Sequence, residues 1–185
     1  MKEAEDHILN IIAGDPWRMA ALSAVRDLDL PDWAVGAGFV RAAVWDAHYG
    51  YPVPTPLGDI DVVYFAPRDP SRIRERRLEQ VLASSCPGLP WSVRNQARMH
   101  RRNGDRPYRD TTDAIAHWLE TPTCVAVRLM ADDSLRLIAP HGLGDLIRHR
   151  SRPTPTGRRK MADFMGRVRT KDWRAKWPGL VIRRV

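Results

Sequence analysis

Two aspartates, Asp59 and Asp61, open a segment whose other residues are typical of a β-strand. Strand side chains alternate between two faces, so both carboxylates should lie on one face, about 6–7 Å apart. Ile60, Val62 and Tyr64 should then lie on the other face. Two carboxylates this close repel each other unless a divalent cation lies between them, and Mg²⁺ combines such a pair with phosphate oxygens. The pattern indicates a metal site, and a solvated turn is the alternative.

A glycine turn precedes this segment, at Gly36 and Gly38 in residues 35–41. The surrounding residues predict a strand before the turn and a helix after it. Such a turn presents backbone N–H groups at the positive end of a helix, where a phosphate can bind. The turn is neither a Walker loop nor a G-x-G-x-x-G motif, and a purely geometric role for the glycines is the alternative.

A basic cluster follows the predicted strand at residues 91–94, and it consists of Arg94, Arg98, His100, Arg101 and Arg102. Guanidinium groups bind phosphate oxygens in a bidentate way, so the cluster could clamp a triphosphate or another polyanion. A solvated strand end and loop is the alternative interpretation.

The composition excludes several classes of protein. The chain has 185 residues and two cysteines, which rules out a disulfide scaffold and favours a cytosolic setting with free thiols. No apolar run reaches the length of a membrane span, and the N-terminus does not resemble a signal peptide. The six histidines show neither an H-E-x-x-H motif nor zinc-ligand spacing.

The positive charge is concentrated at the C-terminus. Residues 148–185 contain 13 Lys and Arg against two Asp, whereas residues 1–147 contain 17 basic and 20 acidic residues. Trp173 and Trp177 are interleaved with these charges, as in surfaces that bind RNA or DNA. Residues 161–176 also carry apolar side chains at helical spacing, which predicts a packed helix with solvated charges.

The elements that must position these residues alternate along the chain. The patterns predict helices at residues 3–12, 17–28, 39–47, 71–83, 112–119 and 142–150, and strands at residues 33–36, 59–65, 91–94, 125–129 and 135–138. This interleaving predicts an α/β (α+β) fold with a mixed sheet flanked by helices. We expect one domain over residues 1–185, with N-terminal helices in 1–30, a core in 31–147 and a basic C-terminal flank in 148–185.

Several segments together resemble a known superfamily. A strand ending in glycine, a helix and a strand opening with Asp-x-Asp is the layout of the DNA polymerase β-type nucleotidyltransferases. A small bacterial branch of that superfamily is similar to this chain at residues 38–41, 44–46, 58–65, 95–100, 140–146 and 177–178. The resemblance implies a nucleotidyltransferase-like fold over nearly the whole chain.

The resemblance also implies an activity. Asp59 and Asp61 would hold Mg²⁺ or Mn²⁺ with a nucleoside triphosphate, and a hydroxyl of an unknown acceptor would attack the α-phosphorus. Gly36, Gly38 and Arg41 would contact the nucleotide. RNA or another polyanion is one candidate acceptor, and no membrane partner is expected; the oligomeric state stays open.

One departure from the superfamily pattern leaves alternatives open. A third carboxylate is expected on a neighbouring strand, but the strand at residues 91–96 contains no acid, and Asn95 is the nearest equivalent. Asparagine can ligate a metal through its carbonyl oxygen but cannot act as a base. The alternatives are a relative that binds metal-nucleotide or nucleic acid without transfer, and a basic nucleic-acid-binding module in which the aspartates are incidental.

Overall fold

The computed structural model describes residues 2–184, and a mixed five-stranded sheet forms its centre. The strands lie in the order β3-β2-β1-β4-β5, with β2 and β3 parallel and the other neighbours antiparallel. Their bounds are β1 Ala34–Gly36, β2 Ile60–Tyr64, β3 Trp91–Asn95, β4 Ala126–Leu129 and β5 Leu135–Ile138. The predicted mixed sheet and its α/β class are therefore confirmed.

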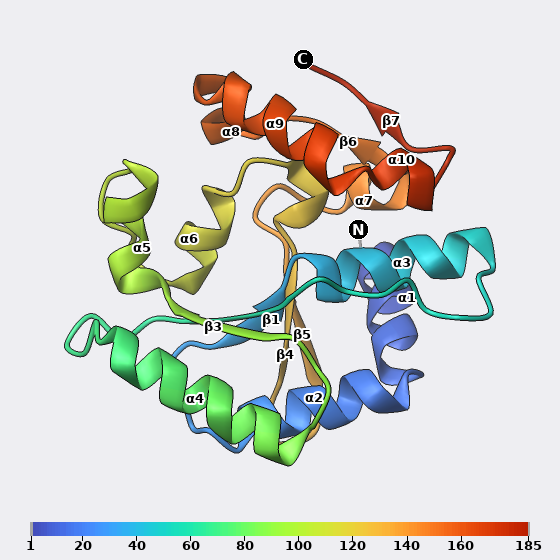
Figure 1. Cartoon of the computed structure of the whole chain (residues 1–185). Helices are drawn as coiled ribbons and strands as arrows, with labels where there is room; N and C mark the ends of the chain where they lie inside the picture. The colour runs from blue at the N-terminus through green and yellow to red at the C-terminus, as the bar shows by residue number, and fades with distance from the viewer. Residues whose placement is uncertain (1, 185) are drawn as a thin grey trace.

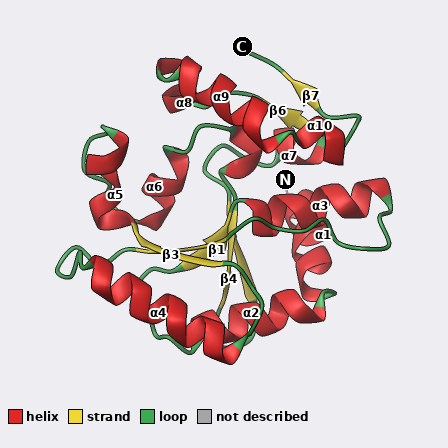
Figure 2. Ribbon diagram, in the orientation of Figure 1, coloured by secondary structure: helices red, strands yellow, loops and turns green. Residues whose placement is uncertain are grey.

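Helices cover both faces of the sheet (Figures 1 and 2). α2 (Pro16–Arg26) and α4 (Arg72–Ser85) lie together below the sheet in these views, and α1 (Lys2–Ala13) and α3 (Gly38–Tyr49) lie beside it. The opposite face carries α5 (Gln96–Asn103), α6 (Thr111–Ala116) and the C-terminal helices. α5 lies in a stretch with few apolar residues, and the sequence patterns do not predict it.

Local capping explains where several helices begin. The Asp15 side chain accepts a hydrogen bond from the Arg18 N–H, and Pro16 occupies the first turn of α2. Ser71 caps α4 in the same manner, at the Arg74 N–H. Asn95 ends β3 and caps α5 through the Ala97 N–H, so the chain passes from strand to helix without a loop.

The C-terminal flank packs on the core through aromatic side chains. The predicted helix at residues 161–176 is divided into α9 (Met161–Lys171) and α10 (Trp173–Lys176), because Asp172 adopts a left-handed conformation with φ 43°. Trp173 and Trp177 are both 2% exposed, and their rings lie 6.0 and 5.0 Å from the ring of the fully buried Trp45.

Four further short elements complete this region. α7 (Gly144–Ile147) and α8 (Pro155–Arg159) precede α9, and β6 (Arg150–Ser151) pairs in parallel with β7 (Val181–Ile182). The region lies next to α3 (Figure 1). No helix among residues 2–184 is long and apolar enough to cross a membrane.

Candidate active site

The two aspartates lie at the start of β2, as the alternation predicts. Asp59 directly precedes the strand and Asp61 is its second residue, and both line the same cavity. Ile60, Val62 and Tyr64 are fully buried on the other face. The apolar residues therefore anchor the strand in the core and hold both carboxylates at the cavity.

The carboxyl of Asp61 resists ionisation. Burial raises its pKa to about 6, and the nearby carboxylate of Asp59 adds to the effect, while Lys171, Arg167 and Arg41 oppose it. The Lys171 ammonium lies 3.9 Å from the Asp59 carboxylate. A carboxylate whose pKa is raised by burial and by a neighbouring carboxylate is strongly stabilised by an added cation, because the cation offsets both the burial cost and the mutual repulsion.

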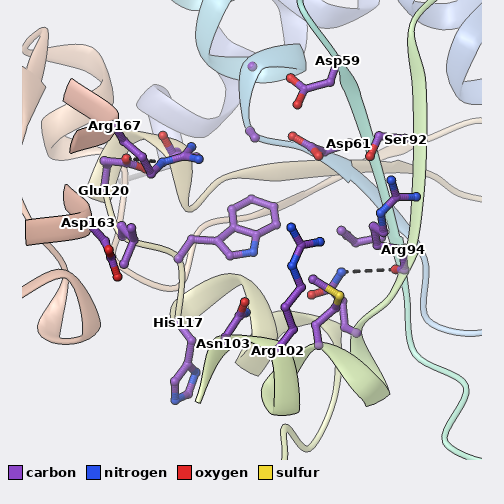
Figure 3. Close-up of a pocket in the computed structure, with 18 of the residues that line it drawn as sticks. Asp59, Asp61, Ser92, Arg94, Arg102, Asn103, His117, Glu120, Asp163 and Arg167 are labelled. Carbon is purple, nitrogen blue, oxygen red and sulfur yellow. Dashed lines mark hydrogen bonds and ion pairs between the residues drawn. The ribbon is translucent and has the colours of Figure 1, made fainter. Parts of the chain in front are cut away.

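The cavity has a volume of about 650 Å³ and lies between β2, β3, α5, the segment after α6, and α9. Figure 3 shows Asp59 and Asp61 on one side, Arg94 and Arg102 on the second, and Glu120 with Arg167 on the third. Cationic side chains contribute much of the lining, namely Arg41, Arg94, Arg102, Lys160, Arg167 and Lys171. A cavity with one acidic pair inside a cationic wall suits a metal-bound polyphosphate.

The glycine turn contributes Gly38 and the start of α3 to this cavity. Ala37, rather than a glycine, takes the unusual conformation there, with φ 53° and ψ −118°. No side chain caps α3, so its first N–H groups have no capping partner within the described residues, 2–184. The positive end of a twelve-residue helix thus faces the acidic pair's cavity, as a phosphate-binding turn requires.

Arg41 lies in the first turn of α3 and is only 8% exposed. Its guanidinium donates to the Thr123 hydroxyl over 2.9 Å and stacks on the Trp173 ring at 4.5 Å, but its Nε has no partner among the described residues. Burial lowers the pKa of Arg41 to about 10, with Glu120 opposing the shift. A buried, incompletely paired cation at the cavity wall is ready to bind an anionic group.

The parallel register of β2 and β3 determines which residues accompany the acidic pair. Ser92 pairs with Asp61, and Arg94 pairs with Val63, and all four residues line the cavity. Asn95 pairs with Tyr64, which belongs to the opposite face of the strand. The strand position next to Asp61 is therefore a serine.

Asn95 and Arg98 belong to a separate network on that opposite face. The side-chain amide of Asn95 forms hydrogen bonds with the backbone of Ala66 and Asp69. The backbone N–H of Asn95 donates to the Glu75 carboxylate over 2.8 Å. Arg98 forms a bidentate ion pair with the same carboxylate. Glu75 is 3% exposed, so this network is buried and internally paired.

Gly36 and His100 also lie outside the cavity lining, as far as residues 2–184 describe it. Gly36 is covered by the indole of Trp118, since a Cβ at this position would come within 3.0 Å of that ring. The His100 ring meets the edge of Tyr108 at 6.1 Å. Of the predicted site residues and the predicted basic cluster, the structure brings together Asp59, Asp61, Gly38, Arg41, Arg94 and Arg102.

Several other cavity residues were not among the predicted site residues. Trp118 and Glu120 follow α6, and Lys160, Arg167 and Lys171 come from the C-terminal flank. Glu120 is fully buried and accepts from the Arg167 guanidinium over 2.6 Å. The only available signal was the concentration of basic residues in that flank.

The donor set fits a hard divalent cation that shares its ligands with substrate. Among the described residues there is no group of three or more His, Cys, Asp or Glu side chains that could hold a metal alone. Mg²⁺ takes oxygen ligands and is commonly bound by one or two carboxylates together with substrate phosphates and water. Asp59 and Asp61 satisfy this requirement, whereas soft or tightly caged metals are not suited to it.

The chain belongs to a family of nucleotidyltransferases: the family model described as "Nucleotidyltransferase" matches residues 23–182. Within this class it is similar to a solved structure described with the words "The NMR structure of the protein reveals a CCA-adding enzyme head domain". The two share 30% sequence identity and a TM-score of 0.87 over 97% of this chain and 96% of the other. Among curated proteins, none matches. The resemblance seen in the sequence is thus confirmed.

Proposed function

We propose that the protein transfers a nucleotidyl group from a nucleoside triphosphate to a hydroxyl acceptor, using Mg²⁺ or Mn²⁺. The observation that carries this proposal is the convergence of Asp59 and Asp61 on the same cavity as the start of α3. The family and the similar CCA-adding enzyme head domain support it.

Each group has a distinct role in the proposed reaction. Asp59 and Asp61 would hold the metal, which when bound neutralises charge on the phosphates and on the attacking and leaving oxygens. Gly38 and the first turn of α3 would bind phosphate oxygens, with Arg41 and Arg94 as cationic partners. Catalysis would come from positioning and electrostatic stabilisation, because phosphoryl chemistry requires little else from the protein.

The acceptor we propose is RNA or a related polyanion. Lys160, Arg167 and Lys171 line the cavity from the basic C-terminal flank, and this flank also carries exposed cations such as Arg169 and Lys176. Cations of this kind neutralise phosphates and draw a nucleic acid toward the site. The similarity to a CCA-adding enzyme head domain favours the same class of acceptor.

Ser92 favours a second candidate function, which is binding of metal-nucleotide without transfer. In the parallel register Ser92 is the neighbour of Asp61, where a third acid could ligate metal or take the proton of an acceptor hydroxyl. A serine hydroxyl brings no charge and cannot act as a general base at neutral pH.

A labelling experiment separates these functions. The wild-type protein, Asp59→Ala/Asp61→Ala and Ser92→Asp are incubated with labelled ATP, CTP, GTP or UTP, Mg²⁺ or Mn²⁺, and several RNAs, while nucleotide binding is measured by calorimetry. We expect the wild type to transfer label and the double substitution to abolish this transfer. Metal-dependent binding without transfer, with transfer gained in Ser92→Asp, would instead establish the second function. Transfer that survives the double substitution would refute the site.

A further inference from the structure

Trp118 lines the same cavity as the acidic pair, and its packing contacts within the protein cover only part of its ring. It follows α6 and is half-buried. One side of the residue packs on the small apolar cluster formed by Ala34, Val63, Ile115, Cys124 and Ala126. The residue nevertheless lines the cavity, so part of the indole borders the space into which Asp59 and Asp61 point.

The position of the ring relative to the metal pair follows from the strand register. A Cβ at Gly36 would lie 3.0 Å from the outer ring atom Cη2 of Trp118, so the benzene end of the indole rests on β1 at that residue. Gly36 is the antiparallel partner of Asp61 on β2. Paired Cα atoms in such ladders are about 4.5–5.5 Å apart. The indole is therefore anchored one strand away from Asp61.

The backbone of Trp118 is held as firmly as its ring. Its carbonyl accepts a hydrogen bond from the Thr154 hydroxyl over 2.6 Å, and its N–H donates to the Ile115 carbonyl over 3.1 Å. The absence of a side chain at Gly36 is what lets the ring approach the sheet. A flat aromatic surface that is fixed before binding loses little conformational freedom when a ligand stacks on it.

The indole N–H is also unused within the described part of the chain. Trp45, Trp91 and Trp177 each donate this group to a protein oxygen, whereas Trp118, like Trp17, Trp33 and Trp173, has no such acceptor among residues 2–184. At a cavity wall the free donor is available to a ligand.

From these contacts we infer that Trp118 is the stacking platform for the base of the nucleoside triphosphate. The inference rests on the proposed function and specifies how that site holds the base. The triphosphate lies at Asp59, Asp61 and the start of α3, and the base extends along β1 onto the indole. Val63 and Met99 complete the apolar part of this wall. Stacking on one aromatic ring is tolerant of base identity, so affinities for the four nucleotides should be similar.

The test compares nucleoside triphosphates with inorganic tripolyphosphate, which carries the same phosphate chain and no base. Binding to wild type, Trp118→Ala and Trp118→Phe is measured by calorimetry in Mg²⁺, with Trp17→Ala as the control, because Trp17 is half-buried and lies outside the cavity lining. Trp118→Ala should weaken binding of each nucleoside triphosphate by about 10- to 100-fold and leave tripolyphosphate affinity within about twofold. Trp118→Phe should retain most of the affinity, and Trp17→Ala should change neither.

The outcomes are distinguishable from failure of the proposed function. If the wild type binds no Mg²⁺-nucleotide, both proposals fall together. If nucleotide binding is intact in Trp118→Ala, or nucleotide and tripolyphosphate lose affinity equally in a variant with an unchanged melting temperature, only the stacking role is refuted. A loss confined to single-stranded oligonucleotides would assign Trp118 to the acceptor and would also overturn the inference. An unfolded Trp118→Ala leaves Trp118→Phe, compared with Trp118→Leu, as the deciding pair.

Discussion

The two faces of the β2–β3 pair carry polar groups in contrasting states. On the face covered by α4, Glu75 accepts from Asn95 and Arg98, and all three are largely enclosed. On the cavity face, Asp61 stands beside Asp59, with the neutral Ser92 as its strand neighbour. Fully paired polar groups stabilise a fold, whereas a ligand can supply the missing partner of an incompletely paired group. The comparison indicates that one face is structural, and it supports the proposal that the other binds substrate.

Removing the buried acid of the structural face should have the largest effect on stability. Glu75→Ala leaves Arg98 and the Asn95 N–H without their partner, and breaking a buried pair costs about 3–5 kcal/mol of unfolding free energy. Urea denaturation measures the loss. Glu79→Ala is the control, since Glu79 lies on the same helix but its side chain is 25% exposed, and it should cost about 1 kcal/mol. Equal losses in the two variants would contradict the assignment of this network as structural.

Substitution in the acidic pair should impair nucleotide binding and transfer. Asp61→Asn removes one of the two proposed metal ligands, so Mg²⁺-dependent nucleotide binding and transfer should fall by about 100-fold or more, as expected for several kcal/mol of lost charge stabilisation. Asp163→Asn is the matched control, because this acid lines the same cavity but is exposed and lies on α9. Its effect should stay within about threefold. A comparable loss in Asp163→Asn would move the metal site away from β2.

The contrast between these faces shows what the sequence could predict. The alternation of Asp59 and Asp61 with buried apolar residues is visible in β2 alone, so the acidic pair and the mixed sheet were predictable. The neighbour of Asp61 was not, because it depends on the register between β2 and β3, and a shift of one residue exchanges the two faces. Ser92 faces the cavity and Asn95 faces α4 for that reason.

The rest of the cavity could not be predicted because it is assembled from distant segments. Trp118 reaches the site because the chain after α6 brings its ring against Gly36 of β1. Arg167 reaches the site because α9 lies close enough for this side chain to pair with Glu120. The sequence patterns did not predict α5, because this helix begins at the Asn95 cap and has no apolar stripe. Such features depend on tertiary topology, which local patterns do not encode.

The stability contribution of Asp61 on the cavity face should depend on pH. The folded pKa of Asp61 is about 6, above its ordinary value of 3.8, so the unfolded chain loses this proton at a lower pH than the folded protein. The contribution of Asp61 to stability is therefore most favourable below about pH 4 and declines as pH rises to about 6.

Comparison of wild type with Asp61→Asn isolates this contribution. At pH 7 the variant should be more stable by about 1–2 kcal/mol, with allowance for solvent screening, and the difference should vanish near pH 4. Urea denaturation across this range measures it. A difference independent of pH would show that Asp61 carries no burial or repulsion cost in the folded protein.

Ala37 offers the smallest and most discriminating test of the cavity face. Its φ of 53° and ψ of −118° are adopted readily only by glycine, and such strain costs about 1–3 kcal/mol. Ala37→Gly relieves it but loses a methyl that is 7% exposed and frees the unfolded chain, so a net gain of about 0.5 kcal/mol is expected. Ala42→Gly, in the interior of α3 at 1% exposure, has no strain to relieve and should lose about 1–2 kcal/mol. Thermal and urea denaturation compare them, and equal losses would mean that the turn holds no strain. A gain in Ala37→Gly accompanied by weaker tripolyphosphate binding would show that the strained turn holds the start of α3 in place for phosphate.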